Sequence, residues 1–474
     1  MGRCWWRAGV KGAVAAETGG PGERWWRRPE RLFLLVAAVW GLGFVVLTPP
    51  FQVPDENRHF YRAYQLVQAD WVGCVRGGQP GGFLPTNVVR TGESTQDMLP
   101  WAGRATYRLE RTRELLVLRV DRQNQNFARF ASAAYSPVAY VPEAIAIGLG
   151  SWADLPPIVL MYLGRLANLA CWIALMAAAI RTTPVFRWVF FALALTPMSL
   201  IEGASLSADS MTNGLAFLTI ASFLRWAVAA ERRLRGRDVA WLVLLTTGVS
   251  LCKHAYFLLV CLYFLIPPER AGSRRAWAGF FGLLVAVNLA ALGLWAYVMR
   301  DLAGLGLRPG AAPAEQIRLI LNDPWGYVVT VAHTVVWYGR SLARSFVGVL
   351  GWTDTYLPDW HWKGWLAVLV GVSLLDGRAE VEIRWRRRVL GLAVAAATIL
   401  GIVTALYIYW NDLASPVIRG WQGRYVYPVA PLLFLVFYQR RLTMSDRAKG
   451  PALAVLTMLS LSVTLGVLVR RFYG

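Results

Sequence analysis

The feature that most constrains this chain of 474 residues is a series of about 11 apolar segments separated by short polar connections. In a bilayer, every backbone N–H and C=O must find a partner within the protein, so apolar segments of this kind cross as helices. Several segments are shorter than the roughly 20 residues that a perpendicular helix needs. The pattern predicts an all-α polytopic membrane protein with about 11 transmembrane helices. The segments cover residues 32–49, 158–180, 188–204, 210–229, 239–252, 255–267, 276–298, 362–376, 389–409, 426–438 and 451–468.

Composition supports a membrane protein and argues against a nucleic-acid-binding one. Only 16% of the residues are charged, whereas soluble domains carry about 25%. The net charge is +21, but the arginines gather between the apolar segments, where they act as topology signals and contact anionic headgroups. We therefore expect membrane lipids, and no nucleic acid, among the partners. The five cysteines form no CxxC pair, so neither a disulfide framework nor a zinc site is expected.

The basic connections predict the orientation of the chain, because arginine and lysine are enriched in cytoplasmic loops. All the short basic connections fall on the cytoplasmic side if residues 325–350, interrupted by Arg340 and Arg344, do not cross. The N-terminus is then cytoplasmic, and residues 50–157 form a large first extracytoplasmic loop. Three parts are expected: a tail over 1–31, a membrane domain over 32–440, and a C-terminal loop with the last transmembrane helix over 441–474.

Three local patterns predict structure at the edges of the membrane. Residues 107–122 alternate between polar and apolar side chains, which suggests a small hairpin. Residues 131–149 are apolar but short and carry two prolines, so a juxtamembrane helix is expected there, with a true crossing as the alternative. Residues 239–267 are expected to form two short or broken helices that meet at Lys253.

An acidic motif follows the first apolar segment directly. Pro54 suits the first turn of a helix, and the positive end of the helix dipole favours the ionised forms of Asp55 and Glu56. His59 lies four residues after Asp55 and shares its helix face. A polar cluster anchored at a membrane surface is how an enzyme meets a lipid-linked substrate. The alternative is a helix cap with solvated charges, and this segment alone does not separate the two.

Charged side chains within or beside apolar segments are costly to bury and are usually functional. Arg165 lies about two turns inside an apolar segment, and Lys253 interrupts two of them. Either cation could bind a phosphate. The alternatives are an interhelical carboxylate partner for Arg165 and a snorkelling side chain at a helix break for Lys253. Glu202 and Asp209 flank an outward turn, where such an acid could pair with Arg165 or cap the next helix.

The segment Gly420–Pro428 combines glycine, a cation and aromatic rings. Gly423 would let the backbone approach a ligand closely, and the planar fork of Arg424 suits phosphate. Gln422 and Tyr425 could line a sugar, with an ordinary interfacial anchor as the alternative. The chain has no Walker A loop and no HExxH motif, which argues against an ATP-driven pump or a zinc protease.

Seven short pieces in this order carry a resemblance to a known family. They are Pro54-Asp55-Glu56 with His59, Tyr135-Ser136-Pro137 with Tyr140, Gly164-Arg165, Pro197 with Ser205, Ser207 and Asp209, Lys253 with Tyr256, Gly351-Trp352 with Asp354, and Gln422-Gly423-Arg424-Tyr425 with Pro428. Over nearly the whole chain, the order and spacing of these pieces resemble the bacterial polytopic membrane proteins catalogued as domain of unknown function 2142.

That family is similar to the C-type glycosyltransferase superfamily, and the resemblance implies a fold and an activity. The fold is a helical membrane bundle whose first external loop holds an acidic motif. The activity is transfer of a sugar from a polyprenyl-phosphate donor to an envelope glycan, lipid or protein acceptor outside the cytoplasm. The usual Asp-x-Asp or Glu-x-Asp pair is here Asp55-Glu56, so no metal site is assigned; these two would be the ligands of any divalent cation, Mg²⁺ or Mn²⁺. The expected location is the bacterial plasma (inner) membrane.

The residues and the resemblance together give a mechanism to test. Asp55 or Glu56 would act as general base on the acceptor hydroxyl, with His59 orienting Asp55 or binding the acceptor. Three cations would hold the donor phosphate, and four further side chains would contact substrate. The phosphate-binding residues are Arg165, Lys253 and Arg424, and the substrate-binding residues are Arg58, Asp209, Gln422 and Tyr425.

Other functions remain open from the sequence. A transporter or flippase of an envelope glycolipid would use the same cationic groove without bond chemistry, although no inverted repeat is detected to favour it. An envelope polysaccharide polymerase or ligase and a non-catalytic scaffold are further alternatives. The large outer loop that starts with an acidic motif favours an enzyme, so a glycosyltransferase that uses a lipid-linked sugar is the leading hypothesis.

Overall fold

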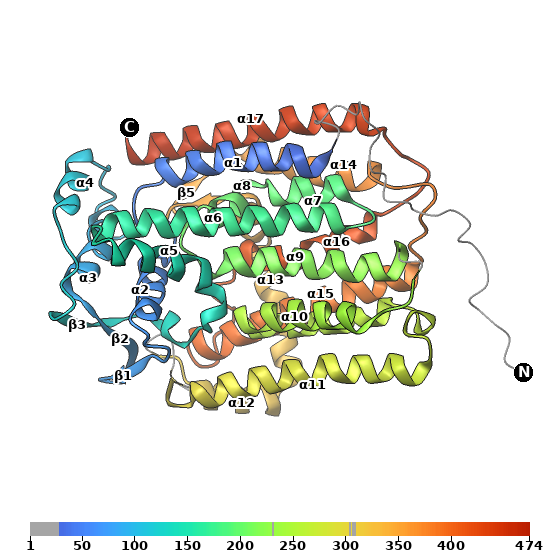
Figure 1. The fold of residues 1–474 in the computed structure, drawn as a ribbon, viewed down its shortest axis with the longest axis horizontal. Coiled ribbons are helices and arrows are strands. Elements are labelled where there is room, and N and C mark those ends of the chain that lie inside the picture. The colour runs from blue at the N-terminus through green and yellow to red at the C-terminus, as the bar shows by residue number, and fades with distance from the viewer. Residues whose placement is uncertain (1–27, 230–231, 303–304, 306–309) are drawn as a thin grey trace, which may run out of the picture.

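The computed structural model describes residues 28–229, 232–302, 305 and 310–474, and the predicted N-terminal tail lies almost entirely outside these ranges. Long helices lie side by side along the longest axis of the molecule, and a smaller lobe covers one end of them (Figure 1). We call this end the loop end; α1 (Pro29–Leu47) and α17 (Asp446–Phe472) both finish there. The opposite end, where both helices begin, is called the arginine end.

Helices make up most of the described chain, and proline opens several of them because the first turn needs no N–H donor there. The other α-helices are α2 (Glu56–Val67), α3 (Thr86–Gly92), α4 (Leu109–Leu116), α5 (Val141–Trp152), α6 (Pro157–Thr182), α7 (Arg187–Ala194), α8 (Pro197–Gly203), α9 (Ala208–Leu224), α10 (Gly236–Cys252), α11 (Arg274–Val298), α12 (Pro313–Asn322), α13 (Pro324–Val347), α14 (Asp359–Leu375), α15 (Trp385–Trp410) and α16 (Ala430–Phe434). The 3₁₀-helices are η2 (Gln96–Met98), η3 (Ala131–Ala134), η4 (Pro137–Tyr140), η6 (His254–Leu265), η7 (Pro268–Ala271), η8 (Arg300–Leu302), η9 (Gly423–Val429) and η10 (Leu435–Phe437). The element η5 (Arg225–Ala229) is a short π-helix.

Among the described residues, five helices are long and apolar enough to cross a membrane by length and composition, namely α1, α6, α11, α15 and α17. The most apolar window of α11 is only 11% buried inside the protein, so most of its apolar surface is free to face lipid. The other apolar segments predicted from the sequence form shorter helices. The protein is therefore a mainly helical, multi-pass membrane protein, in which length and composition support five of the roughly 11 predicted crossings.

One helix break divides a shorter apolar segment, and a second break separates two others. α7 ends at Ala194, and Pro197 opens α8 after it, because proline lacks the N–H that would continue the first helix. The predicted break at Lys253 is confirmed: α10 ends at Cys252, and η6 begins at His254. Lys253 itself is extended, with φ −150° and ψ 122°. The break places a cation between two apolar helices.

The short basic connections gather at the arginine end, as expected if they share one side of the membrane. Leu234 N donates to Arg270 O at 2.7 Å, which joins two of the connections. Asp376 accepts hydrogen bonds from Trp188 N and from Lys449 Nζ, which joins three more segments. The connections cover residues 181–187, 232–237, 270–275, 378–388 and 440–449.

Residues 325–350 fall mostly in α13, a continuous helix with both ends near the loop end. Tyr327 Oη, near its start, lies 2.6 Å from Thr404 Oγ1 in the last two turns of α15. Trp352, just after its end, donates to Phe51 O, just after α1, at 3.0 Å. This placement agrees with the expectation that the segment does not cross the bundle. Which end faces the cytoplasm stays a prediction.

The smaller lobe at the loop end, called the outer lobe from here on, contains a three-stranded antiparallel sheet in the order β1-β2-β3. Gly77 and Gly78 join the first two strands with φ values of 57° and 73°, a two-residue turn that suits glycine because it has no Cβ. The strands are β1 (Cys74–Arg76), β2 (Gln79–Pro85) and β3 (Gln125–Arg129), and a separate hairpin after α13 pairs β4 (Val349–Leu350) with β5 (Thr355–Tyr356).

The hairpin predicted over residues 107–122 is wrong, because Leu109–Leu116 forms α4. This run consists largely of Leu, Glu and Arg, which are strong helix formers, and Leu115 is its one buried residue. Alternation over so short a stretch did not outweigh that propensity. The helix expected within residues 131–149 is confirmed as α5, preceded by the turns η3 and η4.

Candidate functional site

The acidic motif begins α2 at the loop end. Asp55 is the N-terminal cap residue and has a left-handed backbone with φ 62° and ψ 8°, a conformation that is uncommon outside glycine. Aspartate and asparagine adopt this conformation more readily than other residues with a side chain. The Asp55 side chain is 41% exposed and accepts a hydrogen bond from Arg58 Nη1 at 2.9 Å. Asp55 is thus an accessible carboxylate in the segment that leads from α1 into the outer lobe.

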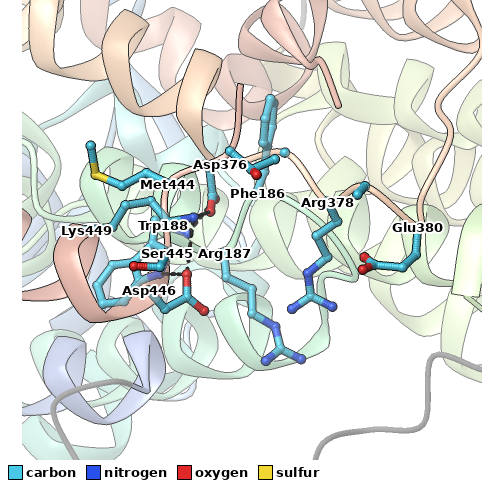
Figure 2. Close-up of a pocket in the computed structure, with 13 residues that line it drawn as sticks. Phe186, Arg187, Trp188, Asp376, Arg378, Glu380, Met444, Ser445, Asp446 and Lys449 are labelled. Atoms are coloured by element: carbon cyan, nitrogen blue, oxygen red, sulfur yellow. Dashed lines mark hydrogen bonds and ion pairs between the residues drawn. The ribbon is translucent and has the colours of Figure 1, made fainter. Parts of the chain in front are cut away.

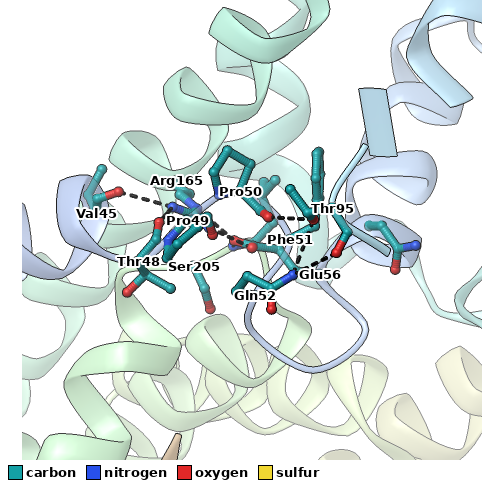
Figure 3. Close-up of polar contacts among 12 residues, drawn as sticks. Val45, Thr48, Pro49, Pro50, Phe51, Gln52, Glu56, Thr95, Arg165 and Ser205 are labelled. Atoms are coloured by element: carbon teal, nitrogen blue, oxygen red, sulfur yellow. Dashed lines mark hydrogen bonds and ion pairs between the residues drawn. The ribbon is translucent and has the colours of Figure 1, made fainter. Parts of the chain in front are cut away.

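Glu56, the next residue, has entirely different surroundings. Its carboxylate receives two hydrogen bonds from Arg165, at 2.7 Å to Oε1 and 2.6 Å to Oε2, and neither side chain has exposed surface (Figure 3). Leu206 N also donates to Oε1 at 3.1 Å. The remaining Arg165 donors bond the carbonyls that follow α1, those of Val45, Thr48 and Pro49. This closed network ties α2 to α1, α6 and the start of α9.

A second group of charges lies where α9 begins, where α10 breaks and where η9 begins. Lys253 Nζ forms an ion pair with Asp209 Oδ1. Lys253 Nζ also lies 5.2 Å from the centre of the Tyr425 ring, and Arg424 Cζ lies 5.2 Å from the same centre. The Tyr425 ring is therefore flanked by the adjacent Arg424 and by Lys253, which is distant in sequence and is brought there by the fold. Arg424 is 8% exposed and faces Glu202 at 4.0 Å.

His59 connects the acidic motif to this second group. Its Nδ1 lies 2.7 Å from Tyr140 Oη. Burial lowers the pKa of His59 to about 4, against the opposing effect of nearby carboxylates, so the ring is neutral at neutral pH. The charged groups that act on it are Asp55, Asp209, Lys253 and Arg424. We call Asp55, His59, Asp209, Lys253, Arg424 and Tyr425 the loop-end cluster.

Three buried polar atoms in or beside this cluster have no hydrogen-bond partner among the described residues. They are Glu202 Oε1, Asn213 Oδ1 and Arg424 Nε. Asn213 Nδ2 donates to the other Glu202 oxygen at 2.9 Å, but the 4.0 Å between Arg424 Nε and Glu202 Oε1 is too long for a hydrogen bond. Buried polar groups are nearly always paired. These atoms therefore mark a place where polar atoms of water or a ligand would be stabilised.

The residues described do not group in a way that fits a metal ion. Within these ranges, no three His, Cys, Asp or Glu side chains lie close enough together to hold one. Asp55 and Glu56, the ligands expected for any divalent cation, have different partners, since Glu56 is bound within the protein by Arg165.

Most of the chain matches one known family of membrane proteins. The model of the predicted membrane protein family DUF2142, domain of unknown function 2142, matches residues 38–433. The chain belongs to this family. The matched span runs from within α1 to α16, so it contains every residue of the loop-end cluster. The comparisons with curated proteins and with solved structures found no match.

The structure brings together most of the site residues predicted from the sequence of this family member. Asp55, Arg58, His59, Asp209, Lys253, Arg424 and Tyr425 lie at the loop end in contact or within electrostatic range of one another. Gln422 is half-buried and directly precedes η9. Glu56 and Arg165 lie in their own closed network. Their predicted catalytic and phosphate-binding roles stay predictions.

Two partnerships were not predicted from the sequence. Asp209 neither pairs with Arg165 nor caps α9; it pairs with Lys253, and Ser207 caps that helix by accepting from Asp209 N at 3.1 Å. Glu202 faces Arg424 rather than Arg165. Burying carboxylates requires compensating partners, so the sequence could signal that these acids would be paired. It could not signal which of the distant cations would pair with each.

Gly423 makes a close backbone contact within the protein, and its predicted approach to a ligand stays a prediction. Its N–H donates to Ser345 Oγ at 2.8 Å, and a Cβ added there would lie 2.7 Å from Phe346 Cα. The glycine therefore lets η9 contact the backbone of α13.

We expect Gly423→Ala to destabilise the protein by about 1–3 kcal/mol, because the backbone of α13 cannot move aside as a side chain could. Denaturant unfolding of the purified protein in detergent measures this. Gly364→Ala is the matched control, since an added Cβ in α14 meets nothing within 4 Å. Equal stability of the two variants would contradict the close approach.

Proposed function

We propose that the protein is a membrane-embedded glycosyltransferase that moves a sugar from a polyprenyl-phosphate donor to an envelope glycan, lipid or protein. In this proposal the bundle resembles C-type glycosyltransferases and crosses the bacterial plasma (inner) membrane about 11 times, with shorter helices completing the count. The N-terminus and the arginine end face the cytoplasm. The loop end, with the outer lobe, then faces the extracytoplasmic side.

The observation that carries the proposal is the convergence of an accessible carboxylate with two cations at the loop end. Asp55 is 41% exposed and caps the N-terminus of α2. Lys253 and Arg424 come from distant segments and flank the same aromatic ring. Transfer from a lipid phosphate needs a base for the acceptor and positive charge for the leaving group. The cluster contains both kinds of group.

In the proposed reaction, the acceptor hydroxyl attacks the anomeric carbon of the donor sugar and gives its proton to the Asp55 carboxylate. The new bond joins the acceptor oxygen to the anomeric carbon. The bond from that carbon to the phosphate oxygen breaks, and its electron pair stays on the phosphate. Direct displacement inverts the configuration. The lipid phosphate leaves without protonation, so the reaction needs no separate general acid.

Lys253 and Arg424 are proposed to neutralise the phosphate as it leaves. Lys253 already forms an ion pair with Asp209. A bound donor phosphate would therefore share the Lys253 ammonium with the Asp209 carboxylate. Within the described part of the chain, the buried Arg424 Nε has no hydrogen-bond partner, and the planar fork of this arginine suits a phosphate oxygen. The neutral ring of His59 is proposed to orient Asp55 or bind the acceptor hydroxyl.

The remaining predicted residues have supporting roles in this proposal. Arg58 holds the Asp55 carboxylate through the hydrogen bond at 2.9 Å. Tyr425 and Gln422 are proposed to contact the sugar. Glu56 and Arg165 are proposed to position α2 through their buried pair, because all five Arg165 N–H donors are directed at protein oxygens.

The test is turnover of lipid-linked sugars by the full chain reconstituted in vesicles. A panel of polyprenyl-phosphate sugars and crude envelope acceptors is supplied, and free polyprenyl phosphate is measured. We expect release by the wild type and a loss of roughly 10²-fold or more in Lys253→Met, because a charge that stabilises the leaving group is removed. Lys363→Met is the matched control, since Lys363 is 57% exposed on α14.

Other outcomes distinguish the alternatives. Transbilayer movement of a lipid-linked glycan without release of lipid phosphate would indicate a transporter or flippase. A ladder of product lengths would indicate a polymerase. Release that is equal in wild type and Lys253→Met would remove Lys253 from the mechanism, and neither binding nor release with any donor would contradict the proposed function.

A further inference from the structure

A cavity at the arginine end lies far from the loop-end cluster. Its volume is about 270 Å³, and it lies between the start of α7, the segment after α14 and the start of α17 (Figure 2). Its lining combines charged and apolar side chains, chiefly Phe186, Arg187, Trp188, Asp376, Arg378 and Lys449. The volume is just under the range of about 300–1,000 Å³ for drug-sized ligands, so a small polar group fits better than a large substrate.

One wall of the cavity is a set of charges that are already paired. Lys449 Nζ lies 2.7 Å from Asp376 Oδ1 and 3.1 Å from Asp446 Oδ1. Asp376 Oδ2 accepts from Trp188 N at 2.8 Å, and Trp188 Nε1 donates to Asp446 at 2.9 Å. These contacts join α7, α14 and α17. The wall is therefore fixed, and its cation is not free to bind an added anion.

The opposite wall carries two arginines of a different kind. The guanidinium groups of Arg187 and Arg378 lie side by side and point away from the Lys449 contacts (Figure 2). Within the part of the chain that the structure describes, neither forms an ion pair; Arg187 Nε donates only to Thr183 O, at 3.4 Å. Glu380 is exposed at the rim. The charge of Arg187 is also affected by Arg378 and by the carboxylates Glu30, Asp446 and Asp376, although none of them forms an ion pair with it among the described residues. Two neighbouring like charges repel, and an anion bound between them would offset that repulsion.

We propose that this cavity binds a phosphate ester, supplied by the headgroup of an anionic membrane phospholipid. Guanidinium groups are planar forks that bind phosphate oxygens in pairs, and two of them can enclose one phosphate. The cavity lies at the end of the membrane helices among basic connections, where anionic headgroups gather. Phe186 and Met444 give the lining apolar surface beside the charges. The site would hold the segment after α14 against α7, independently of any chemistry at the loop end.

The test is ligand binding to the full chain, purified in detergent and stripped of lipid. Three probes are titrated separately: short-chain phosphatidylglycerol, inorganic phosphate, and a diacylglycerol of the same chain length without phosphate. Native mass spectrometry counts bound lipid, and equilibrium dialysis measures bound phosphate. We expect phosphatidylglycerol to bind at least tenfold more tightly than the diacylglycerol, because only the former offers oxygens to the guanidinium groups.

Variants assign the binding to this cavity. The double variant Arg187→Gln with Arg378→Gln is expected to weaken phosphatidylglycerol at least tenfold, and Arg378→Lys to weaken it less, since lysine keeps the charge but loses the fork. Arg447→Gln is the matched control, because Arg447 is exposed at the same end. Size-exclusion profiles establish that each variant is folded.

Three results would count against the proposal. Equal weakening by Arg447→Gln would indicate non-specific attraction to basic residues. Unchanged binding in the folded double variant would place the lipid elsewhere. Inorganic phosphate that binds as tightly as phosphatidylglycerol, with the same loss in the double variant, would retain the phosphate chemistry but overturn the lipid as its source.

Discussion

Glu56→Leu is expected to lower the free energy of unfolding by about 3–5 kcal/mol, because it leaves the Arg165 guanidinium buried without a counter-charge. The pair has no exposed side-chain surface on either partner. Leu206 N would also lose its acceptor. Denaturant unfolding of purified protein in detergent, or the fraction that elutes as folded protein, measures the loss.

A second substitution separates the charge effect from the packing effect. Glu56→Leu combined with Arg165→Met removes both charges, and replacing a buried pair by apolar side chains is often tolerated. We expect this double variant to recover only part of the stability, because the carbonyls of Val45, Thr48 and Pro49 lose their donor. A Glu56→Leu protein that folds as well as the wild type but lacks turnover would instead assign Glu56 a catalytic role.

Asp55→Asn is expected to lower the rate of donor turnover by about 10²–10⁴-fold without loss of folded protein. This is the range that general base catalysis contributes, and the amide cannot accept the acceptor proton as a carboxylate does. Asparagine also adopts the left-handed backbone readily, so the φ of 62° at this position is retained. Release of polyprenyl phosphate under saturating donor and acceptor measures the effect.

Asp154→Asn is the matched control for this variant. Asp154 is also an exposed aspartate with positive φ, 53°, and it follows α5, which packs against α2. It lies outside the loop-end cluster, so its variant is expected to turn over donor at the wild-type rate. Normal turnover in Asp55→Asn would remove Asp55 from the mechanism. Asp55→Asn is thus expected to lose turnover and keep its fold, whereas Glu56→Leu is expected to lose stability.

Local properties of the chain were predictable from the sequence. The apolar segments, the basic connections at one end, the helix break at Lys253 and the acidic start of α2 all follow from hydropathy, charge or proline placement within a few residues. These signals fail where two local tendencies compete. At Leu109–Leu116, alternation suggested a strand, but helix-forming side chains decided the outcome.

The candidate site was predictable as a set of residues and not as a set of partners. The sequence places Lys253 and Arg424 as cations beside apolar segments, and each could have bound a carboxylate or remained free. In the structure Lys253 pairs with Asp209 and Arg424 faces Glu202. The packing of α9 against η6 and η9 brings these residues together. No feature within either segment specifies that contact.

The sequence by itself determined that this chain is a multi-pass membrane protein with most of its candidate site residues near segment ends, because solvation by lipid acts on each segment separately. Only the tertiary structure decided which acid of the Asp55-Glu56 motif is accessible and which is bound. Arg165 is 109 residues from Glu56, and a buried guanidinium must find its counter-charge through helix packing rather than through chain proximity. That packing leaves Asp55 as the exposed carboxylate of the motif.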